Sequence, residues 1–215
     1  MSICPEIILM ARWPAPNRCK NRLSQGIGIE RAANIQKELT NHTISVAKAI
    51  QRKGLAEISL SISGLGPKAS KRWGKESGIN KVQIQGSGSL GLRMRRTITK
   101  CQSKTQHFSR KTKETIVIGT DLPTLCQLDL IEALEIVKNN EIVLGPSNDG
   151  GYWLIGLGEK YLNPLISWPF SGIPWGTNEV LKTTLKSAER EGIKVNLLRQ
   201  QNDLDNIEDL KPWIR

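Results

Sequence analysis

One stretch, Thr115–Leu157, limits the possible folds of this chain most, because it contains two apolar runs that are each followed by an acidic residue. The β-branched run Thr115–Ile118 predicts a buried strand, and Asp121 follows it. A second predicted strand, Ile142–Gly145, is followed by a turn that carries Asp149. Open α/β sheets bind ligands beyond the carboxyl ends of their strands. We therefore expect Asp121 and Asp149 to lie at loop tips above adjacent strands and to share one ligand.

Each aspartate also has a simpler interpretation, since Asp is a common turn residue that hydrogen-bonds its own backbone. Two features favour a functional role. Asp121 lies between a strand and Pro123, and Asp149 precedes the pair Gly150 and Gly151, which lets a ligand approach the backbone. Carboxylate oxygens are hard ligands that suit Mg²⁺ or Mn²⁺ held together with the phosphates of a substrate.

The whole chain, residues 1–215, alternates predicted strands and helices, which indicates a single α/β domain. We expect a mixed, mostly parallel sheet with helices on both faces, and the continuous apolar run Glu6–Ala11 as its first, central strand. The other predicted strands are Ala56–Ile62, Lys81–Gln85, Tyr152–Leu157 and Lys194–Leu198, and the predicted helices are Glu30–Arg52, Ser70–Glu76, Leu90–Cys101, Gln127–Val137 and Asn178–Glu191.

Three segments are predicted to be irregular. Arg12–Gly28 contains two prolines and late glycines, and Gln102–Lys113 is polar, basic and aperiodic. Glu159–Thr177 contains three prolines, and a loop of this length is often a lid or an acceptor-binding feature. Its Trp175 can stack on an acceptor or can simply pack the loop onto the domain, while Thr177 is the expected N-cap of the next helix.

The loop after the first strand carries the candidate nucleotide-binding residues Arg12, Lys20 and Arg22. It lies at the strand end where a ligand is expected, so these cations can hold a diphosphate through charge-assisted hydrogen bonds. The alternative is a solvated basic loop without a ligand.

The length and composition agree with a single enzyme domain. A chain of 215 residues with 38% hydrophobic residues can bury a sizeable core without metals or disulfides. Its four cysteines are widely spaced, which argues against structural zinc and a disulfide framework. No apolar run approaches the ~20 residues of a bilayer span, and Pro5 and Glu6 interrupt the pattern of a signal peptide. We expect a cytoplasmic protein of unknown oligomeric state.

The formal charge of +11 is concentrated in the middle of the chain. Between Ser63 and Lys113 there are 13 Lys and Arg residues and one acid, Glu76, a net charge of +12, so the remainder is nearly neutral. Such a segment can attract nucleic acid or anionic lipid, or it can be a solvated basic face. The second interpretation is favoured, because basic and stacking side chains are not interleaved, and no specific nucleic-acid partner is expected.

Several motifs in the same order resemble a known family. They are ARWPAPNRCKNRL, QGSGSLGLRM, IGTDLP, LGPSNDGGYWLIGL, WGTNEVL and DLDNIEDL. Together they are similar to a bacterial family of presumed glycosyltransferases in the nucleotide-diphospho-sugar transferase superfamily, whose relatives include phospholactate guanylyltransferase and the molybdenum-cofactor nucleotidyltransferases. The resemblance spans nearly the whole chain and implies the GT-A fold, a Rossmann-like α/β architecture.

The resemblance also implies roles for individual residues. In the family the first loop reads approximately PxPGxxKTRL and binds nucleotide; Lys20 and Arg22 match it, whereas Asn17 and Asn21 replace the usual glycine and threonine. Asn tolerates a left-handed backbone, so the turn can survive. The block QGSGSLGLRM keeps Gly86 and Gly88 for close approach of a nucleotide, or as a flexible connector, but has Ser89 for the usual aspartate and Leu92 for a frequent glutamate.

A carboxyl-terminal acid completes the superfamily's metal site together with the acid that matches Asp121. Asp205 is the closest match and Asp203 the second choice, whereas Asp209 is explained by helix capping. This geometry requires the last strand to return beside the central one. It is a property of the fold, and the spacing alone does not imply it.

These observations predict a metal-dependent transferase that uses a nucleotide-sugar donor, a glycosyltransferase whose acceptor is unknown. Asp121 and Asp205 would bind Mg²⁺ or Mn²⁺, Lys20 and Arg22 would neutralise the diphosphate, and Asp149 would position the acceptor or act as a base, with Gly150, Gly151 and Trp175 beside it. One alternative is a nucleotidylyltransferase acting on a phosphorylated small molecule, although the first loop lacks that class's glycine pair. Another is a basic nucleic-acid-binding module with a degenerate enzyme core.

Overall fold

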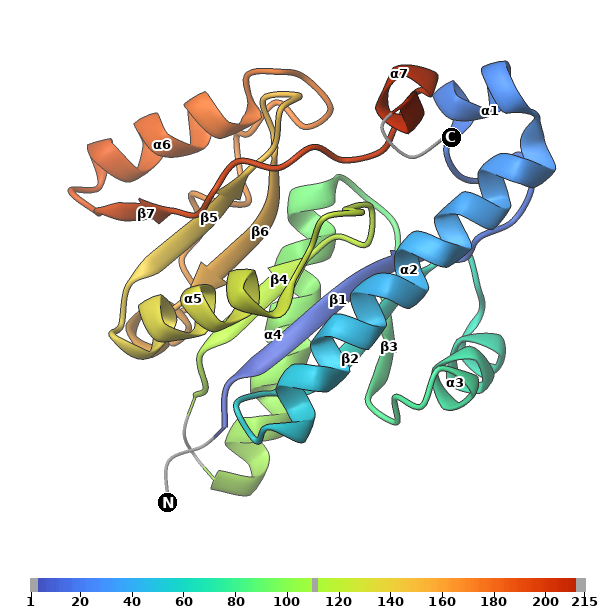
Figure 1. Ribbon diagram of the computed structural model, residues 1–215. Helices are drawn as coiled ribbons and strands as arrows, with labels where there is room; N and C mark the ends of the chain where they lie inside the picture. The colour runs from blue at the N-terminus through green and yellow to red at the C-terminus, as the bar shows by residue number, and fades with distance from the viewer. Residues whose placement is uncertain (1–3, 110–111, 212–215) are drawn as a thin grey trace.

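The computed structural model describes residues 4–109 and 112–211, with the side chains of residues 104–109 excluded. Its strands form one seven-stranded sheet in the order β3-β2-β1-β4-β6-β5-β7 (Figure 1). Strand β6 is antiparallel to both of its neighbours, and all other pairs are parallel. The strands are β1 (Glu6–Arg12), β2 (Glu57–Ser63), β3 (Val82–Ile84), β4 (Thr115–Ile118), β5 (Ile142–Pro146), β6 (Tyr152–Leu157) and β7 (Val195–Leu197).

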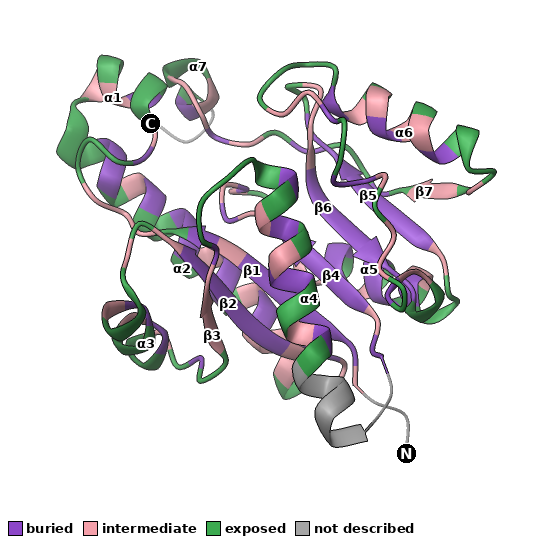
Figure 2. Cartoon of the chain, turned by 180° about the vertical axis from the view of Figure 1, so that it is seen from behind, coloured by how far each residue is buried: buried purple, intermediate pink, exposed green. Residues whose placement is uncertain are grey.

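Helices cover both faces of this sheet, and the alternation of side chains along β1 shows how. Ile7 and Leu9 belong to a cluster with buried residues of α2 (Ile29–Arg52) and α5 (Gln127–Lys138), whereas Ile8 between them belongs to the cluster with Met94 and Ile98 of α4 (Leu90–Ser109). Figure 2 shows α4 crossing the back of the sheet and α6 beside β5 and β7. The helices are α1 (Asn21–Ile27), α2 (Ile29–Arg52), α3 (Pro67–Glu76), α4 (Leu90–Ser109), α5 (Gln127–Lys138), α6 (Val180–Arg190) and α7 (Ile207–Leu210), with a 3₁₀ turn η1 at Glu159–Tyr161.

The expected fold class, an α/β domain with a mixed, mostly parallel sheet, is therefore confirmed. All seven predicted strands are present, and no predicted bound differs from the observed one by more than one residue. Within the described residues, no helix combines the length and the apolar character that a transmembrane span requires.

The prediction that Arg12–Gly28 is irregular throughout was wrong, because Asn21–Ile27 forms α1. This segment has no proline, and its Leu23 is fully buried in a small cluster with Leu39 of α2 and Leu204. Packing of Leu23 against α2 therefore stabilises α1, a helix that the local composition does not predict.

The prediction that Gln102–Lys113 is a loop was wrong for residues 102–109, which continue α4, and positions 110–111 lie outside the described residues. Gln102 is buried although polar. Its amide nitrogen donates to the Lys113 carbonyl at 2.9 Å and to Thr115 Oγ1 at 2.8 Å. The helix therefore extends because a buried amide ties it to the start of β4.

Two smaller expectations also need correction. Helix α6 begins after Glu179, and Thr177 accepts the Glu179 backbone N–H at 3.3 Å in the turn before it, so Thr177 is not the N-cap. The last strand, β7, pairs with β5 at the edge of the sheet and does not return beside the central strands. The chain after β7 instead runs back across the carboxyl end of the sheet towards α7 (Figure 1).

Candidate active site

A cavity of about 440 Å³ opens at the carboxyl ends of β1 and β4, beside the turn between β5 and β6. This volume lies in the range of small-molecule binding sites, and the position is the one at which α/β sheets bind ligands. Eight of the predicted site residues line it, namely Arg12, Lys20, Asp121, Asp149, Gly151, Trp175, Asp203 and Asp205.

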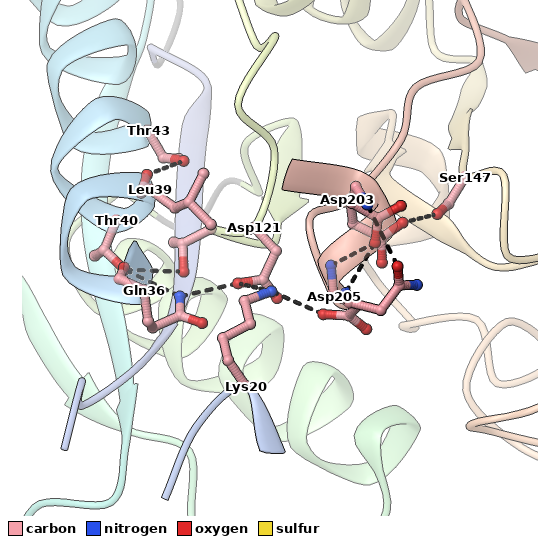
Figure 3. Close-up of polar contacts among 12 residues, drawn as sticks. Lys20, Gln36, Leu39, Thr40, Thr43, Asp121, Ser147, Asp203 and Asp205 are labelled. Atoms are coloured by element: carbon pink, nitrogen blue, oxygen red, sulfur yellow. Dashed lines mark hydrogen bonds and ion pairs between the residues drawn. The ribbon is translucent and has the colours of Figure 1, made fainter. Parts of the chain in front are cut away.

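The centre of the polar part is a lysine between two aspartates (Figure 3). Lys20 Nζ lies 2.8 Å from Asp205 Oδ1 and 3.2 Å from Asp121 Oδ1. The Lys20 side chain is only 2% exposed, whereas the side chain of Asp121 is 44% and that of Asp205 is 41% exposed. Burial alone would lower the pKa of Lys20, but the charges of Asp121 and Asp205 outweigh it and raise that pKa above its ordinary value. Lys20 is therefore an ammonium ion at neutral pH.

The loop after β1 bends sharply to bring Lys20 inward. Asn17 (φ 59°) and Lys20 (φ 50°) both adopt the left-handed conformation, and Lys20 is the N-cap of α1. The expectation that Asn17 can replace glycine in this turn is confirmed. A left-handed backbone is uncommon for lysine, and such strain is frequent at functional sites.

Asp121 is fixed from the side of α2. Gln36 Nε2 donates to Asp121 Oδ1 at 2.9 Å, and the Gln36 side chain is buried next to Thr40, whose hydroxyl contacts Thr120. The backbone carbonyl of Asp121 also accepts the N–H of Leu204 at 3.1 Å. Asp121 thus links α2, β4 and the carboxyl-terminal segment.

The carboxyl-terminal segment delivers the other two acids by running beside the β5–β6 turn. Gln201 N donates to the Pro146 carbonyl, and Asn148 N donates to the Gln201 carbonyl, each at 3.0 Å. Asp203 accepts a hydrogen bond of 2.6 Å from Ser147 Oγ. Burial raises the pKa of Asp203, and the nearby charges of Asp149 and Asp205 add to the effect. Asp205 therefore reaches Asp121 although β7 lies at the sheet edge.

The donor set fits a divalent cation. Asp121 and Asp205 each use Oδ1 for Lys20, and within the described residues neither Oδ2 atom forms a hydrogen bond. No group of three or more metal-ligating side chains occurs in the described part of the chain. Two carboxylates with free oxygens match Mg²⁺, which usually keeps several waters and binds one or two carboxylates plus substrate phosphates.

Asp149 lines the cavity but also shapes its own turn, since its Oδ1 accepts the Gly151 N–H at 2.8 Å. The simpler interpretation of this aspartate, a turn residue, is therefore present in the structure alongside its position in the cavity. Gly150 is not in the cavity lining. A Cβ there would lie 2.1 Å from the Asn178 carbonyl oxygen, so this glycine serves loop packing rather than ligand approach.

Three further expected residues are also absent from the cavity lining. Arg22 lies exposed on α1. Gly86 and Gly88 form a turn that the side chain of Arg96 closes by donating to the Gln85 and Ser87 carbonyls at 2.6 and 3.0 Å. A Cβ on Gly86 would lie 2.6 Å from Arg96 Nη1, so these glycines make room for the protein's own side chains rather than for a nucleotide.

Trp175 packs against neighbouring residues and also lines the cavity. Its ring makes an edge-to-face contact with Tyr152 at 5.9 Å between centroids. A Cβ on Gly91 would lie 2.7 Å from Trp175 Nε1, so the small residue lets the loop approach α4. The two interpretations of this tryptophan are thus compatible.

Sequence reasoning missed the contribution of α4. Leu90, Arg93 and Met94 all line the cavity, and Gln85 lies beside them. The spacing i, i+3 and i+4 places these three side chains on one helix face, a signal that was available in the motif QGSGSLGLRM. Gln36 was also missed, because a single polar residue on an apolar helix face carries no distinctive pattern.

Comparisons with solved structures place this fold in a known class. The crystal structure of a presumed nucleotide-diphospho-sugar transferase from Desulfovibrio desulfuricans G20 superimposes with a TM-score of 0.79 at 23% identity, covering 98% of this chain and 86% of that one. A 4-diphosphocytidyl-2C-methyl-D-erythritol synthase from Anaerococcus prevotii DSM 20548 gives 0.57 at 10% identity, covering 96% and 94%. The Rv0371C protein of Mycobacterium tuberculosis H37Rv in complex with manganese gives 0.50 at 14% identity, covering 98% and 97%.

The chain therefore has the fold of the nucleotide-diphospho-sugar transferase class, as its motifs indicated. Its residues 46–177, more than half of the chain, match the family model described as "Uncharacterized protein conserved in bacteria (DUF2064)". The protein belongs to that family. Among curated proteins, none matches its sequence.

Proposed function

We propose that this protein is a divalent-metal-dependent transferase that uses a nucleotide-sugar donor, a glycosyltransferase. The observation that carries the proposal is the cluster of Lys20, Asp121 and Asp205 at the carboxyl edge of the sheet, inside a cavity of small-molecule size. Three segments far apart in sequence converge there. Such convergence at the expected ligand position is typical of an active site.

In this proposal Asp121 and Asp205 hold Mg²⁺ or Mn²⁺ through their free oxygens. The ion, when bound, neutralises charge on the donor's phosphates. The manganese complex of Rv0371C, which shares the fold, supports a divalent ion in this class. Lys20 keeps the two carboxylates together without metal and is available to a phosphate once an ion competes for them.

Other charged groups of the cavity suit the leaving group and the acceptor of a transfer reaction. Arg12 at the end of β1 supplies positive charge for the diphosphate leaving group. Asp149 and Asp203 also line the cavity, as do Tyr152 and Trp175. An acceptor hydroxyl bound there would donate a hydrogen bond to a carboxylate, and Asp149 is the proposed base.

The test is donor binding measured by thermal unfolding, with a panel of common nucleotide sugars and with or without Mn²⁺. We expect at least one donor to raise the unfolding temperature only when the metal is present. A Lys20→Met variant should lose most of this shift. If no donor in the panel stabilises the wild type with Mn²⁺, the glycosyltransferase assignment fails.

A second candidate is nucleotidyl transfer, in which the phosphate of a small molecule attacks the α-phosphate of a nucleoside triphosphate. The shared fold with 4-diphosphocytidyl-2C-methyl-D-erythritol synthase supports it. This reaction releases pyrophosphate. Pyrophosphate release from a triphosphate and a phosphorylated acceptor, without any turnover of nucleotide sugars, would favour this candidate over glycosyl transfer.

A further inference from the structure

Two arginines in the cavity carry positive charge that no acid neutralises. Arg12 and Arg93 both line the cavity, and within the described residues neither forms an ion pair with an aspartate or glutamate. Arg12 Nη1 donates to the backbone carbonyl of Arg18, at 2.9 Å. Lys20, in contrast, has two carboxylate partners. The uncompensated charge of the cavity therefore lies on the arginines.

Arg93 is held towards the cavity by a buried glutamine. Gln85 is only 3% exposed, and its amide nitrogen donates to the carbonyls of Ala11 and Ser61 at 3.2 and 2.9 Å. These two bonds fix the orientation of the amide. Its oxygen consequently accepts Arg93 Nη1, at 3.1 Å. The ends of β1 and β2 thus position the guanidinium through Gln85, which is neutral and leaves the charge intact.

This arrangement is unfavourable when the cavity holds no anion. Arg93 Nε is buried and has no hydrogen-bond partner in the described part of the chain. Burial lowers the pKa of Arg93, and the charge of Arg12 lowers it further. Two nearby cations, one of them partly desolvated, repel each other. An anion between them would remove the repulsion and accept hydrogen bonds from both guanidinium groups.

The lining of the cavity carries both signs of charge. Its acidic side chains are Asp121, Asp149, Asp203 and Asp205, from the end of β4, the β5–β6 turn and the carboxyl-terminal segment. Its cations without an acidic partner among the described residues are Arg12 and Arg93, from the end of β1 and from α4. A ligand that contacts both sets needs an anionic group for the arginines. Such a ligand can bring a cation to the acids, as a metal-bound diphosphate does.

We infer that Arg12 and Arg93 form an anion site that binds the diphosphate of the nucleotide donor and that needs no metal to do so. Arg93 on α4 is thereby a substrate-binding residue, and Gln85 is the residue that positions it. The inference rests on the proposed function for the identity of the donor, and on the two uncompensated arginines for the site itself.

The experiment uses calorimetry of the full chain with inorganic pyrophosphate in the presence of a metal chelator. Arg93→Met and Arg12→Met each remove one charge and should weaken pyrophosphate binding at least about tenfold, since a charge-assisted contact is lost. Arg95→Met is the matched control, because Arg95 lies exposed on the same helix and outside the cavity lining. It should bind pyrophosphate like the wild type.

Thermal unfolding without any anion separates binding from a structural role. Arg93→Met removes a desolvated charge next to Arg12 but leaves the buried Gln85 oxygen without this donor, so its unfolding temperature should stay close to that of the wild type. A fall in unfolding temperature with unchanged pyrophosphate affinity would make Arg93 a structural residue and overturn the inference. Failure of the wild type to bind pyrophosphate without metal would overturn it too.

The source of the phosphate is tested with two further probes under the same conditions. The affinity for nucleoside diphosphates should be lower in Arg93→Met than in the wild type. The affinity for glycerol 3-phosphate, a phosphate monoester, should be the same in both proteins. If Arg93→Met instead weakened the binding of glycerol 3-phosphate and not that of nucleoside diphosphates, the inference that the site binds the donor's diphosphate would be overturned. Arg93-dependent pyrophosphate binding in a protein that binds no nucleotide sugar with Mn²⁺ would support the anion site while refuting the proposed glycosyl transfer.

Discussion

Asp121 is the residue on which three parts of the molecule depend. One of its oxygens accepts both Gln36 Nε2 and the Lys20 ammonium group, at 2.9 and 3.2 Å. Its other oxygen has no hydrogen-bond partner among the described residues. The same carboxylate can therefore neutralise a buried lysine and still offer one oxygen to a metal ion.

Replacing this carboxylate by an amide separates the two roles. Asp121→Asn keeps the shape of the side chain but removes its charge, so metal-dependent donor binding should weaken at least about tenfold. Lys20 would lose one of its two acidic partners, so the free energy of unfolding without metal should fall by about 1–2 kcal/mol. Calorimetry with Mn²⁺ and donor, together with denaturant unfolding, measures both effects.

A double-mutant cycle with Lys20→Met tests whether the loss of stability comes from the ion pair. The two substitutions should be less than additive, because each removes the same contact. Additive losses of stability would show that Lys20 and Asp121 do not stabilise each other. Unchanged metal-dependent donor binding in Asp121→Asn would remove Asp121 from the proposed metal site.

At the scale of elements, helix α5 is joined to the carboxyl-terminal segment by one buried acid. Asp129 accepts Arg199 Nε at 2.5 Å and Cys126 N at 2.8 Å, and its side chain is 3% exposed. Burial alone would raise the pKa of Asp129, but the hydrogen bonds from Arg199 and Cys126 lower it below its ordinary value. This pair anchors the segment that carries Asp203 and Asp205.

The depressed pKa of Asp129 predicts the sign of a pH effect. Its contribution to stability is present above the unfolded pKa of about 3.9 and is lost as the pH falls through the lower, folded value. In Asp129→Asn the unfolding free energy should be lower at neutral pH and should fall less between about pH 5 and pH 3 than in the wild type. Urea unfolding at several pH values measures both. Equal pH dependence of the two proteins would contradict this role.

Elements that local patterns determine could be predicted, whereas those that depend on distant contacts could not. The apolar run Thr115–Ile118 followed by Asp121 predicts a strand end and an acid at the ligand position, and the structure agrees. Helix α1 depends on burial of Leu23 against α2, and the end of α4 depends on the buried amide of Gln102. Neither contact leaves a periodic signal.

The same distinction between local patterns and distant contacts explains which features of the site could be predicted. Lys20, Asp121 and Asp205 could each be nominated from motifs, but the lysine's place between the two acids depends on the left-handed turn at Lys20 and on the path of the chain after β7. Arg93 was missed because its importance arises from what is absent around it, a partner acid.

For the whole molecule, most of the excess positive charge lies outside the cavity, although Arg93 belongs to both. The net charge is +11, and the basic segment Ser63–Lys113 includes α3, on which Lys68, Lys71, Arg72 and Lys75 are exposed. None of these four residues lines the cavity. Helix α3 lies beside β3, at the opposite edge of the sheet from β7 (Figure 1). Polyanions can therefore bind there without entering the proposed active site.

This separation predicts weak binding of nucleic acid that is independent of sequence and sensitive to salt. Affinity for a DNA duplex should fall steeply between 50 and 200 mM salt, because counterion release dominates such binding. Replacing the four α3 cations by serine should weaken DNA binding and reduce its salt dependence while leaving metal-dependent donor binding unchanged. Fluorescence anisotropy with duplexes of unrelated sequence measures DNA binding, and calorimetry measures donor binding.

Arg93→Met should show the opposite pattern, with weaker donor binding and unchanged DNA binding. Tight, sequence-dependent binding that persists at high salt would instead mean that the basic face is a nucleic-acid site, and it would favour the nucleic-acid-binding module over the enzyme proposal.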